Sequence, residues 1–304
     1  MLVSLADAFG GDALVIEVPA GVRIEHPIAV VHEPLAVPGG AGGAAGVAPA
    51  SFPRIAVRLG EGAEATVVEV YLSGPERRLA VPITELDLEA RSQLSYQSVQ
   101  LLGRSSVQLA YQVSRVGRDA RIVSFSALLG GGNARLSTHS ALVGEGAECQ
   151  LLALYLGDGS QVRDLRTYQD HIAPRTSSEL VFKGAVSGSA RSVYTGLVRM
   201  RKGARRSEAS QTNRNLVLSS GAHADSVPNL DIEENDVRCS HASAVGPIDA
   251  EQRFYVESRG VPPEAAERLI LLGYFEDLLR RAPVAGLAGP VREAIAARLE
   301  TVPG

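Results

Sequence analysis

The chain of 304 residues has only two cysteines, no tryptophan and only two lysines among its 30 basic residues. Cys149 and Cys239 are too few for a disulfide framework, so a reducing compartment is expected. No apolar run approaches the roughly 18 residues that a membrane-spanning helix needs. The N-terminus also lacks the charged and then apolar profile of a secretory signal. These absences predict a cytoplasmic protein that does not bind a membrane.

Several motifs of catalysis and nucleotide binding are missing as well. The chain has no G-x-x-x-x-G-K-[ST] sequence, so it is not expected to bind and hydrolyse a nucleotide as a P-loop protein does. It also has no H-E-x-x-H, C-x-x-C or G-x-S-x-G pattern. The formal net charge is −4 and no long basic run occurs, which argues against nucleic acid as a main partner.

The composition is that of a globular protein, with 45% hydrophobic and 21% charged residues. Short apolar segments at 13–18 and Ile28–His32 predict strands, so the chain is expected to open on strands rather than helices. Residues 37–53 are rich in Gly, Ala and Pro and carry no charge, which predicts a flexible loop. A phosphate cradle in this loop has no supporting lysine or following acidic residue.

A repeat of Gly-rich turn, alanine and strand-like residues follows. The alanines recur about every 13 or 14 residues at Ala120, Ala134 and Ala147, and again at Ala190 and Ala204. That period holds a strand and a turn but no crossover helix. The turns are not the Asn-Gly or Asp-Gly pairs that favour hairpins. Small residues recurring at corners suit stacked coils, so a parallel β-helix with two strands per turn is favoured over a sandwich of hairpins.

The periodicity changes to that of helices after Gly246. Asp249 is a predicted N-cap for a helix at 250–258, which Gly260 ends. Pro263 opens a second helix that carries arginines in its last turn. A linker at 283–290 is expected to precede a final short amphipathic helix.

The second predicted helix is apolar on every side at residues 269–272, which is wider than one core-facing stripe requires. One of its faces is therefore expected to pack on this chain and another on a partner. The chain is expected to divide into a β-helical core at 1–248 and a helical subdomain at 249–304.

Cys239 and His241 form the one candidate site for chemistry. If residues 236–241 are extended, the period of two sends both side chains to the same face. A thiolate and an imidazole are half a set of ligands for zinc or for iron in a cluster. The sequence supplies no further ligands nearby, so the pair is either inert or completed by a second chain. Cys149 lies in an apolar segment and is expected to be a core residue.

Longer motifs around this pair resemble a known family. They are N-R-N-L-V-L at 213–218, A-D-S-V-P-N-L-D-I at 224–232 and D-V-R-C-S-H at 236–241, followed by matching positions up to Gly260. Together with upstream matches, the residues from about 170 to 274 resemble the SufB/SufD family. Ala242 departs from the family's usual glycine. Family members usually have a helical region before the first strands, whereas this sequence is expected to begin almost at the strands.

The resemblance implies a right-handed parallel β-helix followed by C-terminal helices. It implies a non-enzymatic scaffold subunit of the SUF machinery, which pairs with a SufB-like subunit and recruits a SufC-like ATPase through its helices. Cys239 and His241 would then lie near the subunit interface, where a transient iron–sulfur cluster is shared. The presence of only two cysteines is more typical of SufD than of SufB.

The helical residues expected to bind partners are Phe254, Tyr255, Arg259, Leu271, Tyr274, Phe275 and Leu278. Two other functions stay open. The first is a homodimeric scaffold, in which two copies of the Cys239 and His241 pair supply four ligands. The second, a β-helical enzyme acting on polysaccharide, is disfavoured because aromatic residues make up only 5% of the chain.

Overall fold

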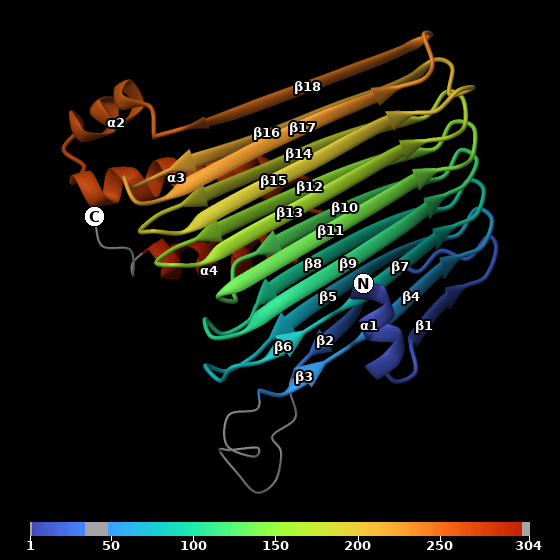
Figure 1. The fold of residues 1–304 in the computed structure, drawn as a ribbon, viewed down its shortest axis with the longest axis horizontal. Helices are drawn as coiled ribbons and strands as arrows, with labels where there is room; N and C mark the ends of the chain where they lie inside the picture. The colour runs from blue at the N-terminus through green and yellow to red at the C-terminus, as the bar shows by residue number, and fades with distance from the viewer. Residues whose placement is uncertain (1, 34–47, 300–304) are drawn as a thin grey trace, which may run out of the picture.

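Strand-forming segments follow one another along most of the chain and build a parallel β-solenoid of about seven turns, with a small helical part at the C-terminus (Figure 1). The computed structural model describes residues 2–33 and 48–299. The strands in chain order are β1 (Leu14–Val18), β2 (Ile28–His32), β3 (Ala50–Ser51), β4 (Arg54–Leu59), β5 (Glu64–Leu72), β6 (Leu79–Ala80), β7 (Ile83–Leu88), β8 (Gln93–Leu101), β9 (Val107–Val116), β10 (Arg121–Leu128), β11 (Asn133–Leu142), β12 (Glu148–Gly157), β13 (Val162–His171), β14 (Ser177–Val186), β15 (Arg191–Met200), β16 (Ser207–Val217), β17 (His223–Ile232) and β18 (Val237–Gly246).

The strands form two sheets that face each other across the solenoid interior. Sheet A has the order β1-β4-β7-β9-β11-β13-β15-β17, with the short β3 and β6 beside it, and sheet B has the order β18-β16-β14-β12-β10-β8-β5-β2. From β4 onward, residues paired in adjacent coils are between 26 and 32 positions apart, as in Val107 with Asn133 and Arg191 with His223. Each coil therefore holds two strands, which confirms the stacked-coil prediction over the hairpin sandwich.

The turns are linked along the solenoid axis by backbone hydrogen bonds. The N–H of Gly62 donates to the carbonyl of Ala90 at 2.8 Å, and that of Arg91 donates to Arg118 at 2.7 Å. Both donor residues have positive φ, +68° at Gly62 and +59° at Arg91, which the tight turn requires. The alanine that follows such a turn is buried at the corner, as Ala120, Ala134, Ala147, Ala190 and Ala204 are.

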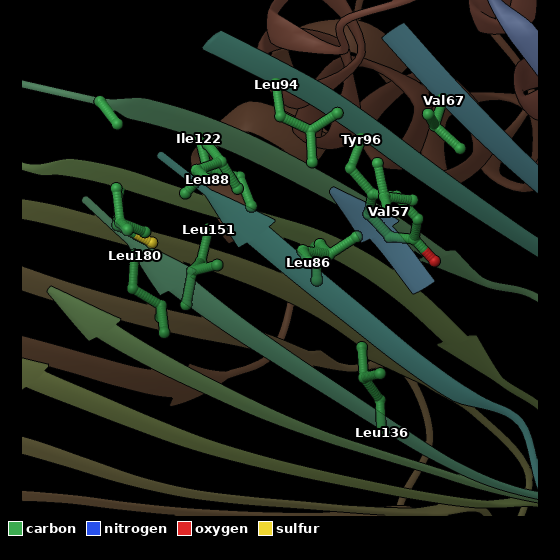
Figure 2. Packing of buried hydrophobic residues seen from close by; sticks show 14 of the residues in the cluster. Val57, Val67, Leu86, Leu88, Leu94, Tyr96, Ile122, Leu136, Leu151 and Leu180 are labelled. Atoms are coloured by element: carbon green, nitrogen blue, oxygen red, sulfur yellow. The ribbon is translucent and has the colours of Figure 1, made fainter. Parts of the chain in front are cut away.

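The interior of the solenoid is filled by columns of apolar side chains. Leu151 of β12 lies beside Leu180 of β14 in the parallel register, and both are at most 1% exposed. Figure 2 shows these two with Leu94, Ile122 and their neighbours inside the coils. Parallel register places like residues above one another, so each coil buries the apolar face of the next.

Four helical segments follow the last strand: α2 (Ala250–Glu257), α3 (Pro263–Arg281), the 3-10 turn η1 (Ala285–Leu287) and α4 (Ala288–Leu299). The predicted N-cap is confirmed, since the Asp249 carboxylate accepts from the N–H of Gln252 at 2.9 Å. Gly260 has φ of +85° beyond the end of α2. The predicted linker at 283–290 is too long, because η1 and the first turn of α4 occupy much of it.

Helices α3 and α4 cover the outer face of sheet B. Phe125 and Leu154 of that face pack in one cluster with Phe275 of α3 and Ile295 of α4. For this reason β12 is buried on both faces over most of its length, whereas β11 in sheet A alternates between buried and half-buried residues. Within the described residues no helix is long and apolar enough to cross a membrane.

The first element corrects the expectation that the chain opens on strands. Residues Leu2–Phe9 form helix α1, in which Asp7 is paired with Arg54 at 2.8 Å and Phe9 stacks on Phe52. A helix this short depends on tertiary contacts, which local pattern does not reveal. Most of the loop predicted at 37–53 lies outside the described residues, and its end includes β3.

His171 lies inside the solenoid at the end of β13 and is fully buried. Its Nδ1 lies 2.7 Å from the Thr176 hydroxyl, and its Nε2 lies 2.7 Å from the Ser178 hydroxyl. Both partners are hydroxyls, so neither stabilises a positive charge as a carboxylate would. Burial lowers the pKa of His171 to about 4.

This buried histidine predicts a loss of stability in acid. Between pH 6.5 and 4 the unfolded chain binds a proton at His171 and the folded chain does not, so the free energy of unfolding falls by up to about 3 kcal/mol. The His171→Gln variant is neutral at every pH and is expected to lack this part of the decrease. Urea unfolding of both proteins from pH 7 to 4.5 measures the difference, and parallel curves would contradict the prediction.

Candidate functional site

The last coil, formed by β17 and β18, is the open end of the solenoid. Each of these strands is the final strand of its sheet and is paired on one side only. Figure 1 shows β18 at the outer edge, with α2 beside its C-terminal end. The apolar side chains Val227, Ile232 and Val245 are between 46% and 49% exposed here. The residues below Ile232 and Val245 in the register, Met200 and Asn215, are at most 2% exposed, so the exposure of these two side chains comes from the end of the stack. Exposed apolar side chains of this kind favour contact with a partner.

Cys239 and His241 lie on the interior face of β18. In the parallel register Cys239 is opposite Ala209 of β16 and His241 is opposite Gln211. Cys239 is half-buried and packs against a cluster that contains Ala209 and the interior residue Met200 of β15. His241 is two residues further along the same strand, so it lies on the same face, and it is exposed. The structure thus places the pair as the sequence pattern predicts.

Cys239 and His241 are both of residue types that bind metal ions, through a thiolate and an imidazole. Burial raises the pKa of the Cys239 thiol, so the thiol is protonated at neutral pH until a metal displaces the proton. Within the residues that the structure describes, no three His, Cys, Asp or Glu side chains gather in a group that could hold a metal ion. Iron or zinc needs about four ligands. A metal ion bound by this pair would therefore need further ligands from outside the described part of the chain.

The second cysteine lies in the same interior column, three coils below. Register pairs Cys149 with Ser178, Ser178 with Ala209, and Ala209 with Cys239. Cys149 is only 3% exposed, and burial raises the pKa of its thiol to about 12. It is a core residue, as its apolar surroundings in the sequence predict.

A groove runs beside the open end, between the C-terminal ends of β16 and β18 and the helices α2 and α3. Its volume is about 1140 Å³. Apolar side chains line much of it, including Leu216, Val245, Ile248, Tyr255 and Ile270. The groove joins the open end of the solenoid to the helical part, so one partner surface could contact both.

Helix α2 has no buried residue, and its aromatic side chains lie on the surface. Phe254 is 72% exposed and Tyr255 is 58% exposed. The guanidinium of Arg259 lies 4.7 Å from the centroid of the Tyr255 ring and donates to its hydroxyl at 3.0 Å. These three residues, all predicted to bind partners, form one aromatic and cationic patch, a composition common in protein interfaces.

The predicted partner residues on α3 require a correction. Leu271, Phe275 and Leu278 are at most 1% exposed and pack against the outer face of sheet B. They recur at three- and four-residue spacing, which is the core-facing stripe of the helix, so they are unavailable to a partner. Tyr274 is half-buried, and its hydroxyl donates to the carbonyl of Arg214 at 2.8 Å. Leu269, which is 55% exposed, marks the outward face that the sequence pattern indicated.

Comparison of the chain with known protein families identifies one that matches it. The family model described as "SUF system FeS cluster assembly, SufBD core domain" matches residues 42–274, well over half of the chain. The chain belongs to the SufBD family. The resemblance predicted from residues 170–274 is therefore confirmed, and the family is one of iron–sulfur cluster assembly.

Curated relatives carry names from the same system. An iron–sulfur cluster assembly SufBD family protein of Mycobacterium tuberculosis is 36% identical over 204 residues, which cover 64% of this chain and 50% of the relative. SufD of Escherichia coli is 30% identical over 242 residues, 79% of this chain and 57% of the relative. SufD of Bacillus subtilis is 27% identical over 291 residues, 94% of this chain and 64% of the relative. This SufBD protein thus spans half to under two thirds of the length of these relatives.

Alanine substitutions at two phenylalanines of the C-terminal helices should change the free energy of unfolding by different amounts. Phe275→Ala removes a fully buried ring between α3 and sheet B and is expected to lower the free energy of unfolding by about 3–5 kcal/mol. Phe254→Ala removes an exposed ring and is expected to change it by less than about 0.5 kcal/mol. Chemical denaturation monitored by circular dichroism measures both. Equal losses in the two variants would contradict the assignment of Phe275 to this chain's own core.

Proposed function

We propose that this chain is a non-enzymatic, SufD-like scaffold subunit of an iron–sulfur cluster assembly complex in the cytoplasm. It pairs with a SufB-like subunit at the open end of the solenoid and recruits a SufC-like ATPase through its helical part. The observation that carries the proposal is the half-site of Cys239 and His241 on the last coil, where a second chain can supply the missing ligands.

The open end supports pairing with another β-rich chain. The outer edge of β18 presents backbone N–H and C=O groups that the described residues leave unpaired, and such an edge accepts a further strand. The apolar side chains exposed on β17 and β18 would be buried by the same contact. A cluster held between the two chains is cargo, for which this chain contributes the sulfur of Cys239 and a ring nitrogen of His241.

The helical part supports recruitment of the ATPase. The chain has no P-loop sequence of its own, so an ATP-dependent assembly step requires another subunit. The patch of Phe254, Tyr255 and Arg259 is exposed on α2 and just beyond its end, and the N-terminus of α2 is capped by Asp249. Membership of the SufBD family leaves the polysaccharide-active alternative without support.

A mixing experiment tests the partners. The chain combined with SufB and SufC is expected to elute as one complex on size-exclusion chromatography under reducing conditions. The double change Phe254→Ala and Tyr255→Ala should weaken SufC binding at least tenfold, because exposed aromatic side chains dominate interface energies. Phe9→Ala is the matched control, since Phe9 is 69% exposed on α1, which does not belong to the C-terminal helices.

Three separate elution peaks would overturn the proposal. A second arrangement, a homodimer, is favoured by the position of Cys239 and His241 on the last coil. A two-fold axis at this end would bring two copies of the pair together and supply four ligands. A tight homodimer that does not exchange with SufB would establish that arrangement in place of the heterodimer.

The His241→Ala variant tests the half-site. It is expected to fold normally, because the side chain is exposed, and to lower the iron and sulfide content of the assembled complex several-fold. His223→Ala is the matched control: this histidine is exposed on β17, pairs with Asp225 at 3.0 Å and lies on the outer face. Iron and sulfide assays after anaerobic purification measure both, and unchanged content in His241→Ala would remove His241 from the site.

A further inference from the structure

Gln211 occupies the interior of the coil directly below the half-site. It is 1% exposed and lies opposite His241 in the parallel register between β16 and β18. Side chains opposite one another in adjacent parallel strands stand on the same face, about 4.8 Å apart at the backbone. Gln211 is therefore the polar side chain of sheet B nearest in register to the His241 ring.

One end of the Gln211 amide is held firmly. Its Nε2 donates to the hydroxyl of Tyr194, and that hydroxyl lies 2.9 Å from the Thr167 hydroxyl. Gly196 makes room for the arrangement, because a Cβ at that position would collide with both Gln211 Nε2 and the Tyr194 hydroxyl. The amide is thus fixed in place by neighbours from β13 and β15.

The other end of the amide has no partner. Gln211 Oε1 is buried and accepts no hydrogen bond from the described residues. A buried acceptor left without a donor lowers the stability of the fold by about 1–3 kcal/mol. The unpaired amide oxygen, one coil below the exposed His241, would therefore gain from a hydrogen-bond donor. The ring N–H of His241 is such a donor.

We propose that Gln211 is a positioning residue for His241, resting on the proposed role of His241 as a ligand. His241 does not make this bond in the structure. When its ring turns toward the solenoid interior about its side-chain torsions, Gln211 Oε1 accepts a hydrogen bond from Nδ1–H, the ring nitrogen nearer the backbone. The lone pair of Nε2 then points out of the open end toward the cargo metal. Ligand histidines generally have their second ring nitrogen fixed in this way, which sets both the tautomer and the orientation of the ring.

Ser226 is the competing partner for the same ring. It lies on the interior face of β17, opposite Tyr194 in the register, and its buried hydroxyl also lacks a partner. A hydroxyl on a short side chain reaches less far across the interior than a glutamine amide. Gln211 is therefore assigned the role, and Ser226 provides the matched control.

The tautomer of His241 in the isolated chain tests the assignment without any metal. Nitrogen-15 spectra of labelled histidine are recorded at about pH 8, above the ordinary pKa of imidazole, and the His241 signals are identified from their loss in His241→Ala. The Nδ1–H form is expected to predominate in the native chain. It should also predominate in Gln211→Glu, whose carboxylate accepts the same bond, and in Ser226→Ala. In Gln211→Leu the Nε2–H form, which free imidazole side chains favour, should replace it.

Identical tautomer ratios in the native chain and Gln211→Leu would overturn the role of Gln211, and a change in Ser226→Ala alone would assign it to Ser226. If Gln211→Leu does not fold, the Gln211→Glu spectrum decides, because an Nε2–H form there also overturns the proposal.

In the assembled complex, Gln211→Leu should lower iron affinity about tenfold or more. Normal cluster content in His241→Ala would refute the proposed function while leaving the tautomer result intact, so the two failures are distinguishable.

Discussion

The parallel backbone ladder between successive coils is the constraint on which the rest of this protein depends. From β4 onward it sets residues 26 to 32 positions apart beside one another, and it repeats the same interior and exterior faces from coil to coil. A ladder of this kind ends with an unsatisfied edge. Here the edge is β18, and the only metal-binding residue types on its interior face are Cys239 and His241.

The same ladder decides where the helices pack. Stacking brings apolar outer-face residues of β8, β10, β12 and β14 together, and α3 and α4 cover them through Phe275 and Ile295. That use of α3 leaves α2 uncovered, with Phe254 and Tyr255 on the surface. One covered helix and one exposed helix therefore lie next to the open coil.

Local signals in the sequence were sufficient for much of the fold. The spacing of alanines such as Ala147 predicts two strands per coil, and Asp249 and Gly260 mark the ends of α2 correctly. Elements that depend on distant contacts were missed. Helix α1 needs Arg54 and Phe52 to hold it, and the buried face of α3 depends on strands such as β10 and β12, which lie far earlier in the chain.

The sequence by itself determined that Cys239 and His241 share a face, because alternation along a strand is a property of the backbone. It also determined the family, through the motifs around them. Only the tertiary structure decided that this face is the interior of the last coil and that the buried amide of Gln211 lies beneath His241. The reason is physical: neighbours in a solenoid are set by stacking between coils, and stacking joins residues that no local pattern connects.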